Sequence, residues 1–126
     1  MGEIMPRILI VDDSPTEVFY FKEILIKYGF DVIEALNAND GIRLAQSELP
    51  DLVLMDIVMP GVNGFQATRQ IAQNPTTKHI PIVIISTKDQ ETDRVWGKRQ
   101  GAIDYLTKPI QEKNLINVIN TYLKKE

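Results

Sequence analysis

The sequence predicts an α/β protein with a five-stranded, doubly wound parallel sheet. Two observations support this. Short apolar runs alternate with longer segments of helical periodicity along the 126 residues, which is typical of strands joined by crossover helices. The connections between these segments are short, and right-handed crossovers place helices on both faces of a sheet. We therefore expect one domain over residues 1–126, with no output domain attached.

Composition limits the classes of function. Apolar residues make up 44% of the chain, and the formal net charge of -3 argues against nucleic-acid binding through broad phosphate contacts. The chain has no cysteine, which excludes disulfides and thiolate metal sites and suits a reducing cytoplasm. No signal-peptide segment precedes Ile8, and no run approaches the roughly 18 apolar residues of a membrane helix. We expect a cytoplasmic protein that binds no nucleic acid and does not insert into membranes.

The first predicted strand covers residues 8–11, a β-branched apolar run, and a helix start follows it. Ser14 is a suitable helix cap, Pro15 suits the first helical position, and Glu17 completes a capping box. Apolar residues then recur at helical spacing until Gly29 ends the helix.

The central segments continue the alternation. Residues 30–35 indicate a second strand, and a second helix begins over residues 37–40. Residues 52–55 are four apolar residues in a row, which predicts a strand buried on both faces. A loop rich in glycine and proline separates this strand from a third helix over residues 64–74.

The last third of the chain supplies two more strands and two more helices. The strands are expected over residues 82–85 and 104–107. The helix expected over residues 89–100 is poor in apolar residues, so Trp96 is either a core anchor or an exposed partner contact. An apolar stripe defines the final helix: Leu115, Val118, Ile119, Tyr122 and Leu123.

Polar residues follow four of the five predicted strands. Asp12 and Asp13 end the first strand, Asp56 the third, Ser86 the fourth and Lys108 the fifth. Because the carboxyl ends of parallel strands meet at one edge, we expect these side chains to converge. Clustered carboxylates raise one another's pKa unless a cation joins them, and their hard oxygens suit Mg²⁺. A lysine and a hydroxyl nearby would hold phosphoryl oxygens, which predicts Mg²⁺-assisted phosphoryl transfer to an aspartate.

These residues in this order resemble the receiver domain of two-component response regulators, the CheY-like family. The resemblance extends over residues 8–124 and implies a flavodoxin-like sheet of strand order 2-1-3-4-5. It makes Asp56 the phosphoacceptor. It also implies that Mg²⁺ is bound by Asp12, Asp13, Asp56 and the backbone carbonyl of Val58, with Asp12 acting partly through water.

The resemblance also implies how the phosphoryl group is held and sensed. Ser86, Thr87 and Lys108 would bind phosphoryl oxygens, and the peptide bond between Lys108 and Pro109 is expected to be cis. Ser86 and Tyr105 would form the switch, with Tyr105 at the family's aromatic position, and the interaction surface would include Trp96 and Tyr105. Valine at 58 and threonine at 87 depart from the commoner family pattern, which leaves the phosphoryl lifetime open.

Longer segments resemble the PilH-type stand-alone regulators of pilus chemosensory systems, which control motility powered by type IV pili. These segments are residues 14–17, 55–70 and 87–102. The resemblance implies a CheA-like histidine kinase as phosphodonor, a downstream motility protein as target, and a monomer or weak dimer. Such a chain is a signalling module that promotes its own phosphorylation and dephosphorylation, and is not otherwise an enzyme.

Three alternatives stay open at this point. The chain could drain phosphoryl groups from a sibling regulator instead of signalling. An aspartyl-phosphate hydrolase of the haloacid-dehalogenase kind would need an acid two residues after the nucleophile, where Val58 stands, and a cap domain. A flavin-binding electron carrier would need a hydroxyl-rich loop after the first strand, where Asp12 and Asp13 would repel the flavin phosphate.

Overall fold

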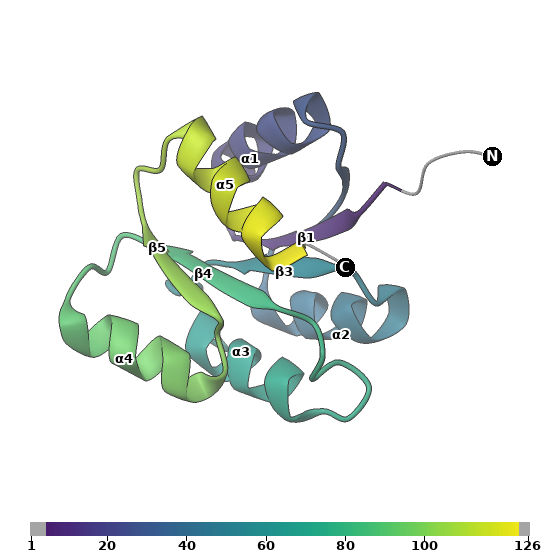
Figure 1. The fold of residues 1–126 in the computed structure, drawn as a ribbon. Helices are drawn as coiled ribbons and strands as arrows, with labels where there is room; N and C mark the ends of the chain where they lie inside the picture. The colour runs from purple at the N-terminus through teal and green to yellow at the C-terminus, as the bar shows by residue number, and fades with distance from the viewer. Residues whose placement is uncertain (1–4, 124–126) are drawn as a thin grey trace.

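A five-stranded parallel sheet forms the centre of the protein in the computed structural model, which describes residues 5–123 (Figure 1). Its strands are β1 (Arg7–Val11), β2 (Asp31–Ala35), β3 (Leu52–Met55), β4 (Ile82–Ser86) and β5 (Asp104–Thr107). Their order is β2-β1-β3-β4-β5, and every neighbouring pair is parallel. The predicted fold class and strand order are confirmed. The expected domain includes residues 1–4 and 124–126, which lie outside the described residues.

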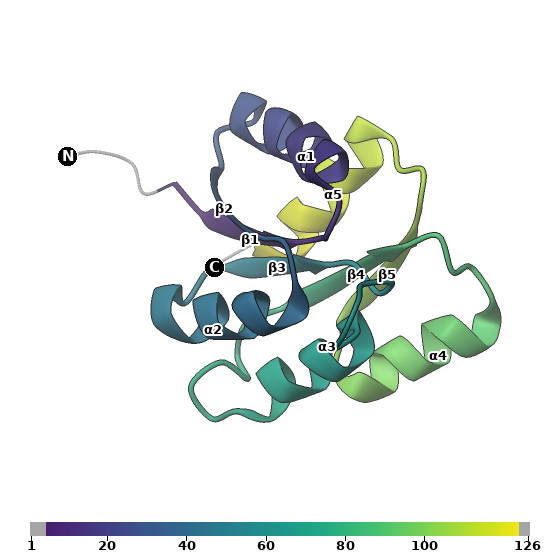
Figure 2. The ribbon, with the colours of Figure 1, turned by 180° about the vertical axis from the view of Figure 1, so that it is seen from behind.

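Five helices cover the two faces of the sheet. They are α1 (Pro15–Lys27), α2 (Ala38–Glu48), α3 (Gly64–Gln73), α4 (Glu91–Gln100) and α5 (Glu112–Leu123). Helices α1 and α5 lie on one face, and α2, α3 and α4 lie on the other (Figures 1 and 2). Within residues 5–123, no helix is both long and apolar enough to cross a membrane.

The sheet separates two apolar cores. Alternate residues of the central strands point to opposite faces, so Leu9 and Val53 pack with α2 and α3, whereas Ile8 and Leu54 pack with α1 and α5. Strands β1, β3 and β4 are buried at almost every position because both of their faces are covered. Ligands therefore have access to the sheet only at its edges.

The start of α1 departs from its predicted capping box. Ser14 Oγ accepts a hydrogen bond from the Glu17 backbone N–H at 3.3 Å, as predicted. The reciprocal bond is missing, because the Ser14 N–H donates to Asp12 Oδ1 at 2.9 Å. The Glu17 carboxylate contacts Lys108 Nζ at 3.4 Å instead. A charged partner has taken the place of a backbone amide, so this half of the prediction was wrong.

Helix α4 packs on the sheet through a glycine and not through its aromatic residue. A Cβ atom at Gly97 would lie 2.9 Å from Ile84 Cδ1 and 3.0 Å from Tyr105 Cδ2, so a larger residue would displace these side chains. Trp96 is 48% exposed and Val95 is 43% exposed. Trp96 is therefore not a core anchor, and its contact with a partner stays a prediction.

Candidate functional site

The carboxylates that follow β1 and β3 meet at the carboxyl edge of the sheet. The register pairs Val11 with Met55, so the next residues, Asp12 and Asp56, are also neighbours. The Asp56 backbone N–H donates to the Val11 carbonyl at 2.9 Å and extends this pairing. Carboxylate oxygens of Asp12, Asp13 and Asp56 lie within 4.8 Å of one another. The structure thus brings together the acids that the convergence of strand ends predicts.

Burial makes this cluster electrostatically costly. Asp12 is 2% exposed and Asp56 is 8% exposed, whereas Asp13 is exposed. Burial, followed by the negative charge of Asp12, raises the pKa of Asp56 to about 6, although Lys108 opposes the shift. Three adjacent carboxylates, whose charge the Lys108 ammonium compensates only in part, match the preference of Mg²⁺ for oxygen ligands. The cluster therefore has the ligand chemistry of a Mg²⁺ site.

Backbone contacts hold the loop between β3 and α3 in place. A Cβ atom at Gly64 would overlap the carbonyl oxygen of Asp56, so α3 begins against this strand end only because residue 64 is glycine. The Gly64 N–H also donates to the Ile57 carbonyl at 3.0 Å. The Val58 side chain is 57% exposed on this loop. The role of the Val58 carbonyl as a metal ligand stays a prediction.

Lys108 brings the positive charge into the cluster. Its Nζ lies 3.1 Å from Asp12 Oδ2, 3.4 Å from Asp56 Oδ1 and 3.4 Å from Glu17 Oε1. Burial disfavours the ammonium form, but the charges of Asp56, Asp12 and Glu17 outweigh burial and raise the pKa of Lys108. The bond from Lys108 to Pro109 is cis, as the resemblance implies. At neutral pH a protonated lysine therefore lies between the cluster and α1.

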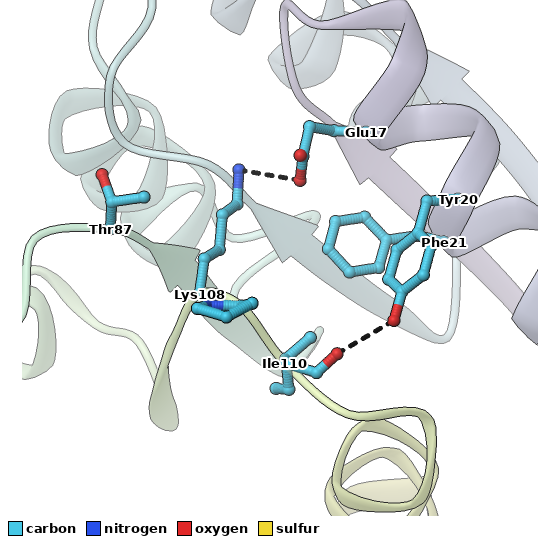
Figure 3. Close-up of a pocket in the computed structure, with 7 residues that line it drawn as sticks. Glu17, Tyr20, Phe21, Thr87, Lys108 and Ile110 are labelled. Carbon is cyan, nitrogen blue, oxygen red and sulfur yellow. Dashed lines mark hydrogen bonds and ion pairs between the residues drawn. The ribbon is translucent and has the colours of Figure 1, made fainter.

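Ser86 and Thr87 reach the same edge from β4. Ser86 is fully buried, and its Oγ accepts a hydrogen bond from the Lys88 backbone N–H at 3.1 Å. The Ser86 carbonyl accepts from the Lys108 N–H at 2.8 Å, which ties the two strand ends together. Thr87 is exposed and lines a pocket beside Lys108 (Figure 3). Their phosphoryl-binding roles stay predictions.

Tyr105 is held inward by contacts that the sequence did not reveal. It is 3% exposed, and its hydroxyl donates to the Lys88 carbonyl at 2.7 Å. Burial raises the pKa of Tyr105. The Arg94 guanidinium lies 5.4 Å from the centre of the ring and donates to the Tyr105 carbonyl at 3.2 Å and to Thr107 Oγ1 at 2.7 Å. Tyr105 thus links the loop after β4 to α4 and β5.

Sequence reasoning missed the contacts that Glu17 and Arg94 make in this site. Arg94 is one of several charged residues on a polar helix, and nothing local distinguishes it. Glu17 carried a local signal, but that signal predicted a capping role. Trp96 is 48% exposed on α4, and its place on an interaction surface stays a prediction.

A pocket of about 470 Å³ opens beside the lysine, between α1 and the loop after β5 (Figure 3). Aromatic rings form one wall, where Tyr20 and Phe21 lie edge to face with their centres 5.3 Å apart. The Tyr20 hydroxyl donates to the Ile110 carbonyl at 3.1 Å and closes one side. Its lining residues are Glu17, Tyr20, Phe21, Thr87, Lys108, Pro109 and Ile110. Glu17 and Lys108 are thus the charged groups on an otherwise mostly apolar lining.

Comparison with known proteins gives matches over nearly the whole chain. The sequence model of the family described as response regulator receiver domain matches residues 8–120. Protein PilH of Pseudomonas aeruginosa is 60% identical over 119 residues, which are 94% of this chain and 98% of that protein.

Two solved structures have the same arrangement of elements. One is a CheY-like response regulator receiver domain protein of Methanospirillum hungatei, with a TM-score of 0.89, 26% identity, and coverage of 95% of this chain and 94% of that chain. The other is the receiver domain of a sensor histidine kinase of Pseudomonas aeruginosa, with a magnesium ion coordinated in its active site cleft. Its TM-score is 0.88 at 26% identity, and coverage is 95% of this chain and 98% of that chain.

Proposed function

The chain belongs to the family of response regulator receiver domains, and from this premise we propose that it is a phosphorylation-switched signalling module whose phosphoacceptor is Asp56. One observation carries the proposal: Lys108 contacts Asp12 and Asp56 within a cluster of three carboxylates. A phosphoryl group on Asp56 needs positive charge around its oxygens, and this arrangement offers an ammonium on one side and a place for a metal ion on the other.

Asp56 is suited to act as the nucleophile. An oxygen of its carboxylate forms a bond to phosphorus while the bond between phosphorus and the donor's imidazole nitrogen breaks. The imidazole keeps the electron pair and takes a proton from water. Mg²⁺ held by Asp12, Asp13 and Asp56 would supply positive charge to the transferring oxygens. Lys108 then exchanges its contact with Asp56 for one with a phosphoryl oxygen, and the surrounding burial strengthens that contact.

The switch would follow from the loop after β4. A phosphoryl oxygen that binds Ser86 or Thr87 would pull on a loop whose Lys88 carbonyl accepts the Tyr105 hydroxyl bond. Any shift of that loop therefore reaches the ring of Tyr105 and the α4–β5 surface where Trp96 is exposed. The size of the change depends on how differently the phosphoryl group binds the two arrangements.

A histidine kinase is the phosphodonor that the family implies. The high identity to PilH supports a place in a pilus chemosensory system, with a CheA-like kinase upstream and a motility protein downstream. We further propose that residues 1–126 work as a stand-alone regulator, since the PilH match covers almost the full length of both chains. We also propose a cytoplasmic location and no direct contact with nucleic acid, and the net negative charge supports the second of these.

Phosphotransfer from purified kinases tests this proposal. We expect a kinase of the source organism that carries radiolabelled phosphohistidine to pass its label to the chain when Mg²⁺ is present. The label should stay on the kinase when Asp56→Asn is the acceptor or when a chelator removes the metal. Transfer to Asp56→Asn at the wild-type rate would contradict the proposal, since the label would then sit on another residue.

A further inference from the structure

Lys108 has a third carboxylate partner outside the acidic cluster. Glu17 Oε1 lies 3.4 Å from Lys108 Nζ, which equals the distance from that nitrogen to Asp56 Oδ1. Figure 3 shows the lysine extended across the pocket with its amine directed at Glu17. The ammonium is therefore shared between the acceptor side of the site and helix α1.

The local chain geometry frees Glu17 for this contact. A capping box would have occupied its carboxylate with the Ser14 N–H, but that N–H is bonded to Asp12 Oδ1. Helix α1 begins at Pro15, so Glu17 lies in its first turn, where the helix dipole favours a negative charge. The carboxylate is therefore free to contact Lys108.

The contact is a weak one that the lysine can exchange. The Glu17 side chain is 42% exposed, whereas the side chains of Lys108 and Asp56 are 14% and 10% exposed. Solvent screens a half-exposed ion pair, so it contributes little to stability. It still competes for the same ammonium group that the phosphoryl oxygens need.

We propose that Glu17 is a positioning residue that holds the Lys108 ammonium partly away from Asp56 and so slows phosphorylation by small anionic acyl phosphates. This inference rests on the proposed function of Asp56. In the reaction with acetyl phosphate, the Asp56 oxygen bonds to phosphorus, and the bond from phosphorus to the acetyl oxygen breaks. Acetate leaves with the electron pair. Lys108 must give up Glu17 to approach the transferring oxygens, and this exchange adds to the barrier.

Two substitutions at one position separate contact from charge. Glu17→Gln removes the charge, whereas Glu17→Asp keeps a charge in the first turn of α1 but is too short by one methylene to hold the same contact. We expect both to raise the rate constant for acetyl phosphate labelling roughly twofold to fivefold, the range that a screened ion pair corresponds to. Intact mass spectrometry at saturating Mg²⁺ and fixed ionic strength measures that rate constant.

Matched controls make the outcome decisive. Glu23→Gln removes a charge from the exposed side of the same helix and should leave the rate constant at the wild-type value. In a Lys108→Ala background, Glu17→Gln should have no effect, because the proposed route runs through the lysine. Beryllofluoride binds without the breaking of a bond in a phosphodonor. Its affinity should therefore rise in both Glu17 variants by a factor similar to that of the rate constant.

Several results would overturn this role. An unchanged or lower rate constant in Glu17→Gln would do so. A Glu17→Asp variant with the wild-type rate constant would also overturn it, as would an equal effect of Glu17→Gln in the Lys108→Ala background. Either result would mean that the charge of Glu17 repels the anionic donor directly and does not act through Lys108. If the wild type takes up no phosphoryl group at all, that result contradicts the proposed function of Asp56. It can be told apart from the results above, in which the wild type is phosphorylated and only the role of Glu17 fails.

Discussion

Lys108→Ala is expected to lower the rate constant of Asp56 phosphorylation by roughly 10²-fold, the usual loss when one preorganised charge-stabilising donor is removed. Lys108 is the cation that contacts both Asp12 and Asp56 among the described residues. Its side chain is largely buried, so water does not screen this charge as it would at the surface. Without it, one flank of the transferring phosphoryl group has no positive partner.

The measurement is a time course of phosphoryl uptake from acetyl phosphate, followed by intact mass spectrometry. Mg²⁺ must be saturating for both proteins. Loss of the ammonium leaves more uncompensated negative charge on the carboxylates and should therefore increase their affinity for the metal. Lys78→Ala, at an exposed lysine in the loop between α3 and β4, is the matched control and should react like the wild type. A Lys108→Ala rate constant within twofold of the wild-type value would contradict the assigned role.

Asp56→Asn is expected to stabilise the metal-free protein by roughly 2–3 kcal/mol at pH 8 and by much less at pH 4. The cause is the position of Asp56, where burial and Asp12 raise the pKa of its carboxyl from 3.8 to about 6. Asparagine has a similar shape but carries no charge to bury. The shift already includes the opposing contact with Lys108, so this gain is the net of burial, repulsion by Asp12 and the lost ion pair.

The pH dependence follows from the direction of the shift. The folded protein binds a proton at Asp56 more tightly than the unfolded chain does, so this group favours folding most below pH 3.8. That contribution is lost as the pH rises through the folded pKa of about 6. Asparagine does not titrate, so the difference in unfolding free energy between variant and wild type should grow between about pH 4 and pH 6 and then stay constant.

Urea unfolding at several pH values, with a chelator present, measures this difference. Asp89→Asn, at an exposed aspartate just before α4, is the control and should show no comparable growth with pH. Added Mg²⁺ should stabilise the wild type more than Asp56→Asn, because a ligand that binds only the folded protein shifts unfolding. A variant that is equally stabilised at pH 4 and pH 8, or destabilised at pH 8, would show that the carboxylates are not crowded as described.

The sequence was sufficient for the parts of the site that depend on chain direction. Apolar runs identified the strands, and parallel strands must bring their carboxyl ends to one edge. The meeting of Asp12, Asp13, Asp56 and Lys108 therefore followed from residues that directly succeed strands. The cap of α1 was predicted in part, because Ser14 Oγ accepts the hydrogen bond from the Glu17 N–H as expected.

Contacts between helices and strand ends could not be predicted in the same way. The position of Glu17 indicated a local hydrogen bond, but Lys108, which is distant in sequence, occupies its carboxylate. Arg94 clamps Tyr105 only because α4 lies close over β5, and Gly97 sets that approach. Whether Trp96 was buried depended on the same packing, for which a polar helix gives no periodic signal.

The location of the phosphoryl group after acetyl phosphate treatment tests the central claim most directly. We expect intact mass spectrometry of the wild type with Mg²⁺ to show one added phosphoryl group, and peptide mapping to place it on Asp56. Asp51→Asn, at the opposite end of the same strand, should label normally, whereas Asp56→Asn should not label. A phosphoryl group on any other residue, or undiminished labelling of Asp56→Asn, would contradict the assignment of Asp56 as the acceptor.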